Sequence, residues 1–140
     1  MADDGDLQAR AAGREKATAG AVILYTTWPD VETAMSAAAE LVEGRFAACA
    51  NLLPGMRSTY RWEGRIEVSE EAVLLLKTMG DAAESLRDRV AAIHPYETPC
   101  ILALPISPSL SATSFLLWME EQVQQGENNA MNGPQSGEKA

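Results

Sequence analysis

The chain has one histidine and two cysteines, whose side chains can bind a transition-metal ion. His94 offers an imidazole, and Cys49 offers a thiol that suits Cu(I). One imidazole alone makes a poor copper site, so other ligands would have to complete it. The alternatives are a structural role for His94 at a helix C-terminus and burial of Cys49 as a small apolar residue. For Cys100, a role as a small strand residue fits best.

A second group of residues has the chemistry of a small-molecule cleft. Its members combine aromatic rings with one cation and one carboxylate, and they are Tyr60, Trp62, Lys77, Tyr96 and Glu97. Such a mixture suits a small polar ligand held between subunits. Tyrosine and tryptophan are equally typical of plain protein interfaces, so a ligand cleft and a structural interface are both open readings.

Signatures of catalysis are missing from the sequence. His94 has no evident nucleophile as a partner, so neither a Ser-His-Asp nor a Cys-His site can be argued. The glycines at 44, 55 and 64 lack the spacing of a phosphate-binding loop, and no CxxC or HxxxH spacing indicates a zinc site. We therefore expect a binding protein and not an enzyme.

The composition limits the partners that the chain can have. The formal net charge is -9 at pH 7 and the sequence pI is about 4.5, which argues against nucleic acid and against anionic membrane surfaces. Two cysteines do not form a disulfide framework, and no apolar run approaches the roughly 20 residues of a membrane span. The first residues show no apolar signal core. We expect a cytoplasmic location.

The pattern along the chain indicates one domain with a tail at each end. Residues 1–19 and 126–140 are polar and rich in small or helix-breaking residues, so we expect a disordered N-terminal segment and a flexible C-terminal tail. The folded domain is expected over residues 20–125. Its expected elements are a strand at 21–27, a helix between 30 and 44, a hairpin over 47–78, a helix over 80–94, a strand at 100–106 and a helix over 111–125.

Two of the helices carry specific expectations. Asp81 and Glu84 have the spacing of a capping box at the start of the second helix. The last helix is expected to place four apolar residues on one side, namely Phe115, Trp118, Met119 and Val123.

The hairpin is the most informative feature of the sequence. After residue 55 its first strand alternates strictly, with Met56, Ser58, Tyr60 and Trp62 on one face and Arg57, Thr59, Arg61 and Glu63 on the other. Pro54 and Gly55 predict a bulge or kink, and Gly64 predicts the turn into a second strand that runs to residue 78. Both strands exceed the mean of about 5–6 residues. An exposed edge of this length invites pairing with another copy of the chain.

The order strand, helix, strand, strand, helix, strand, followed by an extra helix, is the split βαβ pattern of an α+β, ferredoxin-like fold. Right-handed crossovers place the first and third strands in the centre and the second and fourth at opposite edges. Cys49 and Cys100 then belong to opposite edges, and no disulfide is expected between them.

Six segments of the sequence occur together in a known family. They are YTTWPD at 25–30, AACANLLPG at 47–55, YRWEGRIE at 60–67, LLLKT at 74–78, HPYETP at 94–99 and ALPI at 103–106. In order and spacing they resemble the CutA family, the divalent-cation tolerance proteins. The resemblance implies a ferredoxin-like subunit, a homotrimer in which strands of neighbouring subunits pair, and an association with tolerance to copper and other divalent cations.

Proposed copper ligands in that family include a cysteine near the end of the first strand and paired histidines before Pro-Tyr. Here the first strand ends in Tyr25-Thr26-Thr27, and Ile93 occupies the first histidine position. The leading hypothesis is a cytoplasmic homotrimer that binds copper or another divalent cation through His94 and Cys49. The alternatives are a PII-like small-molecule sensor, with its ligand in the inter-subunit cleft, and a protein-interaction scaffold.

Overall fold

The computed structural model describes residues 20–123. The predicted segments 1–19 and 126–140, and the predicted domain end at 125, lie outside that range. The elements in chain order are β1 (Val22–Trp28), α2 (Val31–Glu43), β2 (Cys49–Trp62), β3 (Arg65–Thr78), α3 (Gly80–Ile93), β4 (Ile101–Pro105), the 3₁₀ helix η1 (Pro108–Leu110) and α4 (Thr113–Gln122). None of the helices within residues 20–123 combines the length and the apolar character needed to span a membrane.

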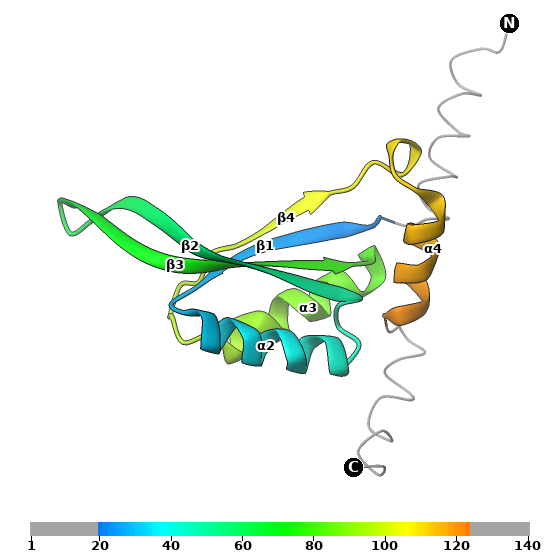
Figure 1. Ribbon diagram of the computed structural model, residues 1–140, viewed down its shortest axis with the longest axis horizontal. Helices are drawn as coiled ribbons and strands as arrows, with labels where there is room; N and C mark the ends of the chain where they lie inside the picture. The colour runs from blue at the N-terminus through cyan, green and yellow to red at the C-terminus, as the bar shows by residue number, and fades with distance from the viewer. Residues whose placement is uncertain (1–19, 124–140) are drawn as a thin grey trace, which may run out of the picture.

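The four strands form one antiparallel sheet in the order β2-β3-β1-β4. This order confirms the α+β, ferredoxin-like fold, with the first and third strands in the centre. Helices α2 and α3 lie together on one face of the sheet, and α4 lies beyond one end of it (Figure 1). The opposite face, called here the open face, is not covered by any helix of the described residues.

The helix layer and the sheet enclose the main core. Its buried side chains come from β1, α2, β3 and α3, and include Leu24, Trp28, Leu41, Leu74 and Leu86. The start of α2 is fixed as the sequence predicts, because the Asp30 side chain accepts a hydrogen bond from the Thr33 backbone N–H over 2.7 Å. The helix ends at Gly44, whose N–H donates to the Glu40 carbonyl over 2.9 Å.

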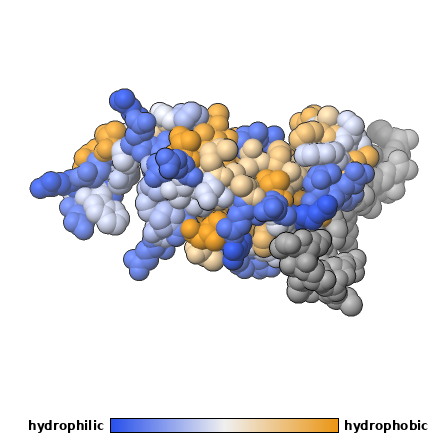
Figure 2. Space-filling view, turned by 60° about the horizontal axis from the view of Figure 1, so that its bottom comes forward, coloured by the Kyte–Doolittle hydropathy of each residue, from blue (hydrophilic) through white to orange (hydrophobic). Residues whose placement is uncertain are grey.

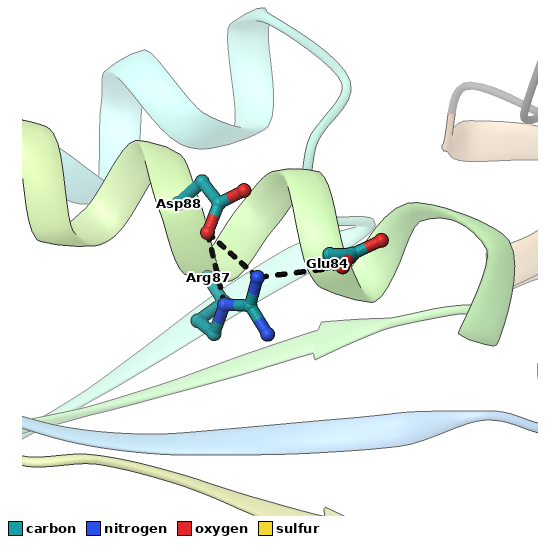
Figure 3. Close-up of polar contacts among 3 residues, drawn as sticks. All are labelled: Glu84, Arg87 and Asp88. Atoms are coloured by element: carbon teal, nitrogen blue, oxygen red, sulfur yellow. Dashed lines mark hydrogen bonds and ion pairs between the residues drawn. The ribbon is translucent and has the colours of Figure 1, made fainter.

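The predicted capping box of α3 is wrong. The helix begins at Gly80, so Met79 occupies the N-cap position, without any side-chain cap hydrogen bond. Glu84 instead accepts a hydrogen bond from Arg87 on the outer surface of the helix, and Arg87 also contacts Asp88 (Figure 3). These side chains are exposed, so the ion pairs add little to stability.

The last helix is shorter than predicted and turns a different side to the core. Leu116, Met119 and Val123 are buried against the end of the sheet. Phe115 and Trp118 were expected on the same side but are exposed, with their ring centroids 5.3 Å apart. Leu116, Met119 and Val123 follow one another at intervals of three and four residues, so they lie on one side of the helix. Phe115 and Trp118 each come one residue before a member of this set, and one residue turns the direction of the side chain by about 100°.

The hairpin follows the predicted pattern closely. Strands β2 and β3 have 14 residues each, and Trp62 pairs with Arg65 across a two-residue turn in which both Glu63 and Gly64 have positive φ. The ladder shifts by one residue between Leu53 and Met56, which confirms the bulge at Pro54-Gly55. Beyond it the hairpin extends past the helix layer (Figure 1).

The bulge decides which face of the hairpin joins the open face. Leu53 and Met56 are three residues apart, so a regular strand would point them to opposite faces. The extra residue puts Met56 opposite Glu71 and Leu53 opposite Val73, which are two residues apart on β3 and therefore share a face. Met56 and the alternate residues after it thus lie on the open face.

Candidate functional site

A cavity of about 1090 Å³ lies on the open face, between the hairpin and the loop that follows α3. Tyr60 and Trp62 of β2 line one part of it, and Glu67 and Glu71 of β3 line the adjacent part. The segment 95–98 and Cys100 complete the wall, together with Tyr25 and Thr27 of β1. The cavity therefore draws on three strands and one loop.

The Glu71 carboxylate joins the hairpin to that loop. Its Oε1 accepts a hydrogen bond from the Ser58 hydroxyl over 2.7 Å, and its Oε2 accepts one from the Tyr96 hydroxyl over 3.0 Å. Partial burial, followed by the hydrogen bond to Glu71 and the charge of that carboxylate, raises the pKa of Tyr96 to about 12. The phenol is therefore neutral at physiological pH and acts as the donor to the carboxylate.

His94 holds the loop in place from the other side. The residue caps the C-terminus of α3 and is only 8% exposed. Its Nε2 lies 2.7 Å from the Thr27 carbonyl oxygen, and its Nδ1 lies 3.1 Å from the Tyr96 backbone nitrogen. Because a carbonyl only accepts and a backbone N–H only donates, the ring is the neutral tautomer protonated at Nε2. Its ring contacts those of Trp28 and Tyr96 at centroid distances of 4.1 and 4.9 Å, with the ring planes tilted by 31° and 51°.

The two predicted metal ligands are far apart within one chain. Cys49 is paired with Lys77, which is paired in turn with Ile23, whereas His94 contacts Thr27. Positions 23 and 27 of β1 are separated by roughly 13 Å, at about 3.3 Å per residue. Both ring nitrogens of His94 are already engaged, so coordination there would replace a hydrogen bond. Residues 20–123 contain no group of three or more His, Cys, Asp or Glu side chains placed to hold a metal ion.

Both cysteines are free thiols and partly buried. Cys49 begins the edge strand β2, and Cys100 immediately precedes β4 at the other edge, in agreement with the predicted arrangement. Cys100 lines the cavity and Cys49 does not.

Most of the predicted cleft residues are brought together. Tyr60, Trp62, Tyr96 and Glu97 all line the cavity. Lys77 does not, because its Nζ lies 5.3 Å from the ring centroid of Phe115, near α4.

The sequence reasoning missed two acidic residues of the cavity. Glu67 lies opposite Tyr60, and Glu71 lies opposite Met56. A two-residue turn at 63–64 pairs residue 60 with residue 67, so the turn alone could have identified Glu67. The same count pairs residue 56 with residue 71, because the bulge lies beyond that pair, so it could have identified Glu71 as well.

Comparison with known proteins places the fold and the sequence motifs in one family. Residues 22–122 match the family model described as CutA1 divalent ion tolerance protein. The divalent-cation tolerance protein CutA of Thermus thermophilus is 42% identical over 101 residues, which cover 72% of this chain and 96% of that protein.

Solved structures agree with the sequence comparison. The Thermus thermophilus Cut A1 structure has a TM-score of 0.70 at 40% identity and covers 74% of this chain and 99% of its own. CutA1 from Oryza sativa has a TM-score of 0.72 at 30% identity, with 76% and 95% covered. A CutA structure from Archaeoglobus fulgidus, described as periplasmic, has a TM-score of 0.70 at 38% identity, with 74% and 99% covered. This chain belongs to the CutA1 family of divalent ion tolerance proteins.

Proposed function

We propose that this protein is a cytoplasmic homotrimer that supports divalent-metal tolerance by binding copper or another divalent cation. The observation that carries the assembly is the pair of free sheet edges. Within the described residues, β2 and β4 each pair on one side only. The two edges differ, so a contact between β2 of one copy and β4 of the next is heterologous, and the proposed trimer is the ring that forms when three such contacts close.

The apolar character of the exposed surface supports the same proposal. Leu102 of β4, on the open face, is 60% exposed, and Leu104 on the same strand is also exposed. The free end of the hairpin carries hydrophobic groups between hydrophilic ones (Figure 2), where Ile66 and Val68 are exposed. Burial of these side chains by neighbouring copies removes apolar surface from water and favours association.

The assembly is tested by analytical ultracentrifugation of the full chain and of Leu102→Glu. We expect three times the chain mass for the parent and a shift to smaller, folded species for Leu102→Glu, because the new charge would lie inside the interface. Leu110→Glu is the matched control, since Leu110 lies in η1 and is 89% exposed. A parent chain that sediments as a compact monomer would disprove the assembly.

For the metal, we propose Cys49 and His94 as ligands that belong to sites completed by a second subunit, because one chain keeps them apart. Calorimetric titration of tag-free protein with Cu(II), and with Cu(I) under anaerobic conditions, tests this. Saturable binding should be lost in Cys49→Ser and in His94→Gln and retained in Cys100→Ser. Binding that persists unchanged in both of the first two variants removes these residues from the site.

The cavity favours a second candidate function, the binding of a small molecule by a sensor of PII-like type. The observation behind it is the convergence of four aromatic side chains, Tyr25, Tyr60, Trp62 and Tyr96, on a large open-face cavity. Thermal-shift screening with metabolites in the presence of a chelator tests it. A hit that Trp62→Leu abolishes supports the sensor, and a hit that the chelator abolishes supports the metal role instead.

The cytoplasmic location is tested by fractionation of the native cells. The Archaeoglobus fulgidus relative is described as periplasmic, so the alternative has a precedent within the family. Recovery of the protein with periplasmic markers would overturn the proposed location.

A further inference from the structure

We propose that the open-face cavity binds an organic ammonium cation, with the rings of Tyr60, Trp62 and Tyr96 as its walls and the nearby carboxylates as its counter-charges. This inference rests on the second function proposed above, that the cavity takes a small molecule, and it names the chemical class of that molecule.

The aromatic walls are the first support. Trp62 is 61% exposed, and Tyr60 and Tyr96 are also exposed. The two tyrosine hydroxyls are held by neighbours on β3, Tyr60 by Ser69 over 3.2 Å and Tyr96 by Glu71 over 3.0 Å. The hydroxyls are thus anchored, while the rings still offer surface to a ligand. The electron-rich face of an aromatic ring attracts a weakly hydrated cation within about 6 Å of its centroid.

The charge of the lining residues is the second support, and it favours a ligand with a positive charge. Glu67, Glu71 and Glu97 line the cavity, and Arg57 is the one basic residue among the lining residues. A nucleotide or another phosphate would meet three carboxylates and only one guanidinium. A cation would gain from all three carboxylates, which a partly closed cavity screens less than open water does.

Two hydrogen bonds hold the Glu71 carboxylate in a fixed orientation on the wall of the cavity. Ser58 and Tyr96 donate one hydrogen bond to each of its two oxygens. Each carboxylate oxygen has a further lone pair, so the group can still accept from a ligand N–H. The raised pKa of Tyr96, caused by burial first and then by Glu71, Tyr60 and Asp30, agrees with a negative potential at this place.

The size and the walls of the cavity favour an organic cation over a bare metal ion. The volume of about 1090 Å³ suits a molecule and far exceeds one ion. A divalent ion needs several oxygen, nitrogen or sulfur ligands at short range, and aromatic rings do not supply them. An alkylammonium group uses both kinds of wall, because its charge meets the carboxylates and its carbon atoms meet the rings.

The test is a titration of the full chain, in its native oligomeric state and at low ionic strength, with three probes followed by calorimetry and tryptophan fluorescence. Tetramethylammonium is the cation, neopentyl alcohol is an uncharged molecule of similar shape, and AMP is the anion. Trp62→Leu identifies the signal from the cavity, since Trp28 is buried in the core and Trp118 lies on α4. Glu97→Gln removes one charge from the lining. Glu70→Gln is the matched control, because Glu70 neighbours Glu71 on β3 but points to the other face.

We expect saturable binding of tetramethylammonium with a fluorescence change that Trp62→Leu removes, and at least about tenfold weaker binding of neopentyl alcohol. Glu97→Gln should weaken tetramethylammonium about fivefold. Glu70→Gln should leave the affinity unchanged.

Two results would overturn the inference in different ways. Equal affinity for neopentyl alcohol, or binding of AMP with a signal that depends on Trp62, would reject the cation and keep the small-molecule function. Failure of all three probes to bind saturably would reject both. A loss of affinity in Glu70→Gln as large as in Glu97→Gln would show that overall charge, and not this cavity, attracts the cation.

Discussion

The Tyr96 hydroxyl donates a hydrogen bond to Glu71 over 3.0 Å and so connects two segments that are 25 residues apart in the chain. Behind it, the Tyr96 backbone N–H donates to the ring of His94, which is bonded in turn to the Thr27 carbonyl. A continuous set of contacts therefore runs from β1 through the loop after α3 to the hairpin. The geometry of the cavity depends on this connection.

Replacement of the Tyr96 hydroxyl should lower the free energy of unfolding and change the titration of the tyrosines. Tyr96→Phe loses the hydrogen bond to Glu71, which we expect to cost about 0.5–1 kcal/mol because the pair is partly solvated. The pKa of Tyr96, raised to about 12, means that the folded protein favours the neutral phenol. The contribution of this preference to the free energy of unfolding is complete below the pKa of the unfolded state, near 10, and is lost as the pH rises through about 12.

Ultraviolet titration of the tyrosines measures this effect. In the parent protein one phenol should ionise last, at about pH 12, and Tyr96→Phe should remove that step. Tyr25→Phe is the control, and it should leave the last step in place. An unchanged final step in Tyr96→Phe would contradict the assignment.

Loss of the His94 ring nitrogens should destabilise the protein strongly. His94→Phe retains a ring beside Trp28 but leaves the Thr27 carbonyl and the Tyr96 N–H without partners. Each buried unpaired group costs about 1–3 kcal/mol, so we expect a loss of about 2–6 kcal/mol in urea unfolding. His94→Gln, which can still donate and accept, should lose less. Equal losses in the two variants would show that the nitrogens contribute nothing beyond packing.

The bulge should depend on the positive φ of Gly55. This residue has φ of 76°, and a Cβ added there meets no atom within 4 Å, so a substitution adds backbone strain and no clash. Gly55→Ala should cost about 1–2 kcal/mol in thermal or urea unfolding. Gly55→Asn should cost less, because asparagine tolerates the left-handed region. If alanine and asparagine are equally harmless, the chain adopts another conformation at this position.

The Asp30 cap should contribute stability in a pH-dependent way. Hydrogen bonds from Thr33 lower the pKa of Asp30 below its ordinary 3.8. Its contribution is therefore present above that value and is lost as the pH falls through the folded pKa. Asp30→Ala should melt at a lower temperature than the parent at neutral pH, and this gap between the two melting temperatures should narrow in strong acid. Asp30→Asn caps without a charge and should show a smaller gap at neutral pH. A gap that does not change with pH would exclude the carboxylate as the cap.

The fold could be predicted because local signals and the order of elements agree. Asp30 and Gly44 delimit α2, and alternation and turn chemistry define the hairpin to the residue. The error at Asp81 arose because a capping box fixes only a spacing, and the chain begins α3 one residue before that aspartate. The error at Phe115 arose because α4 has five consecutive apolar residues, at 115–119, which allow more than one buried stripe.

The candidate site was predictable in part, for a similar reason. Alternation placed Tyr60 and Trp62 on one face, but it could not say what they meet there. Lys77 is six residues from Glu71 along β3, so a shared strand did not put it at the same end of the sheet. The role of His94 depends on the Thr27 carbonyl, a partner 67 positions away in the chain that no sequence spacing reveals.

The extra residue at positions 54–55 also limits how this hairpin can change length. If one residue were added to each strand between the bulge and the tip of the hairpin, every side chain from the insertion to the tip would move to the opposite face of the sheet. The cavity would then receive arginines in place of aromatic rings. Adding two to each strand would lengthen the projection by about 7 Å and keep every side chain on its side. Relatives with longer or shorter arms should therefore differ by even numbers of residues per strand.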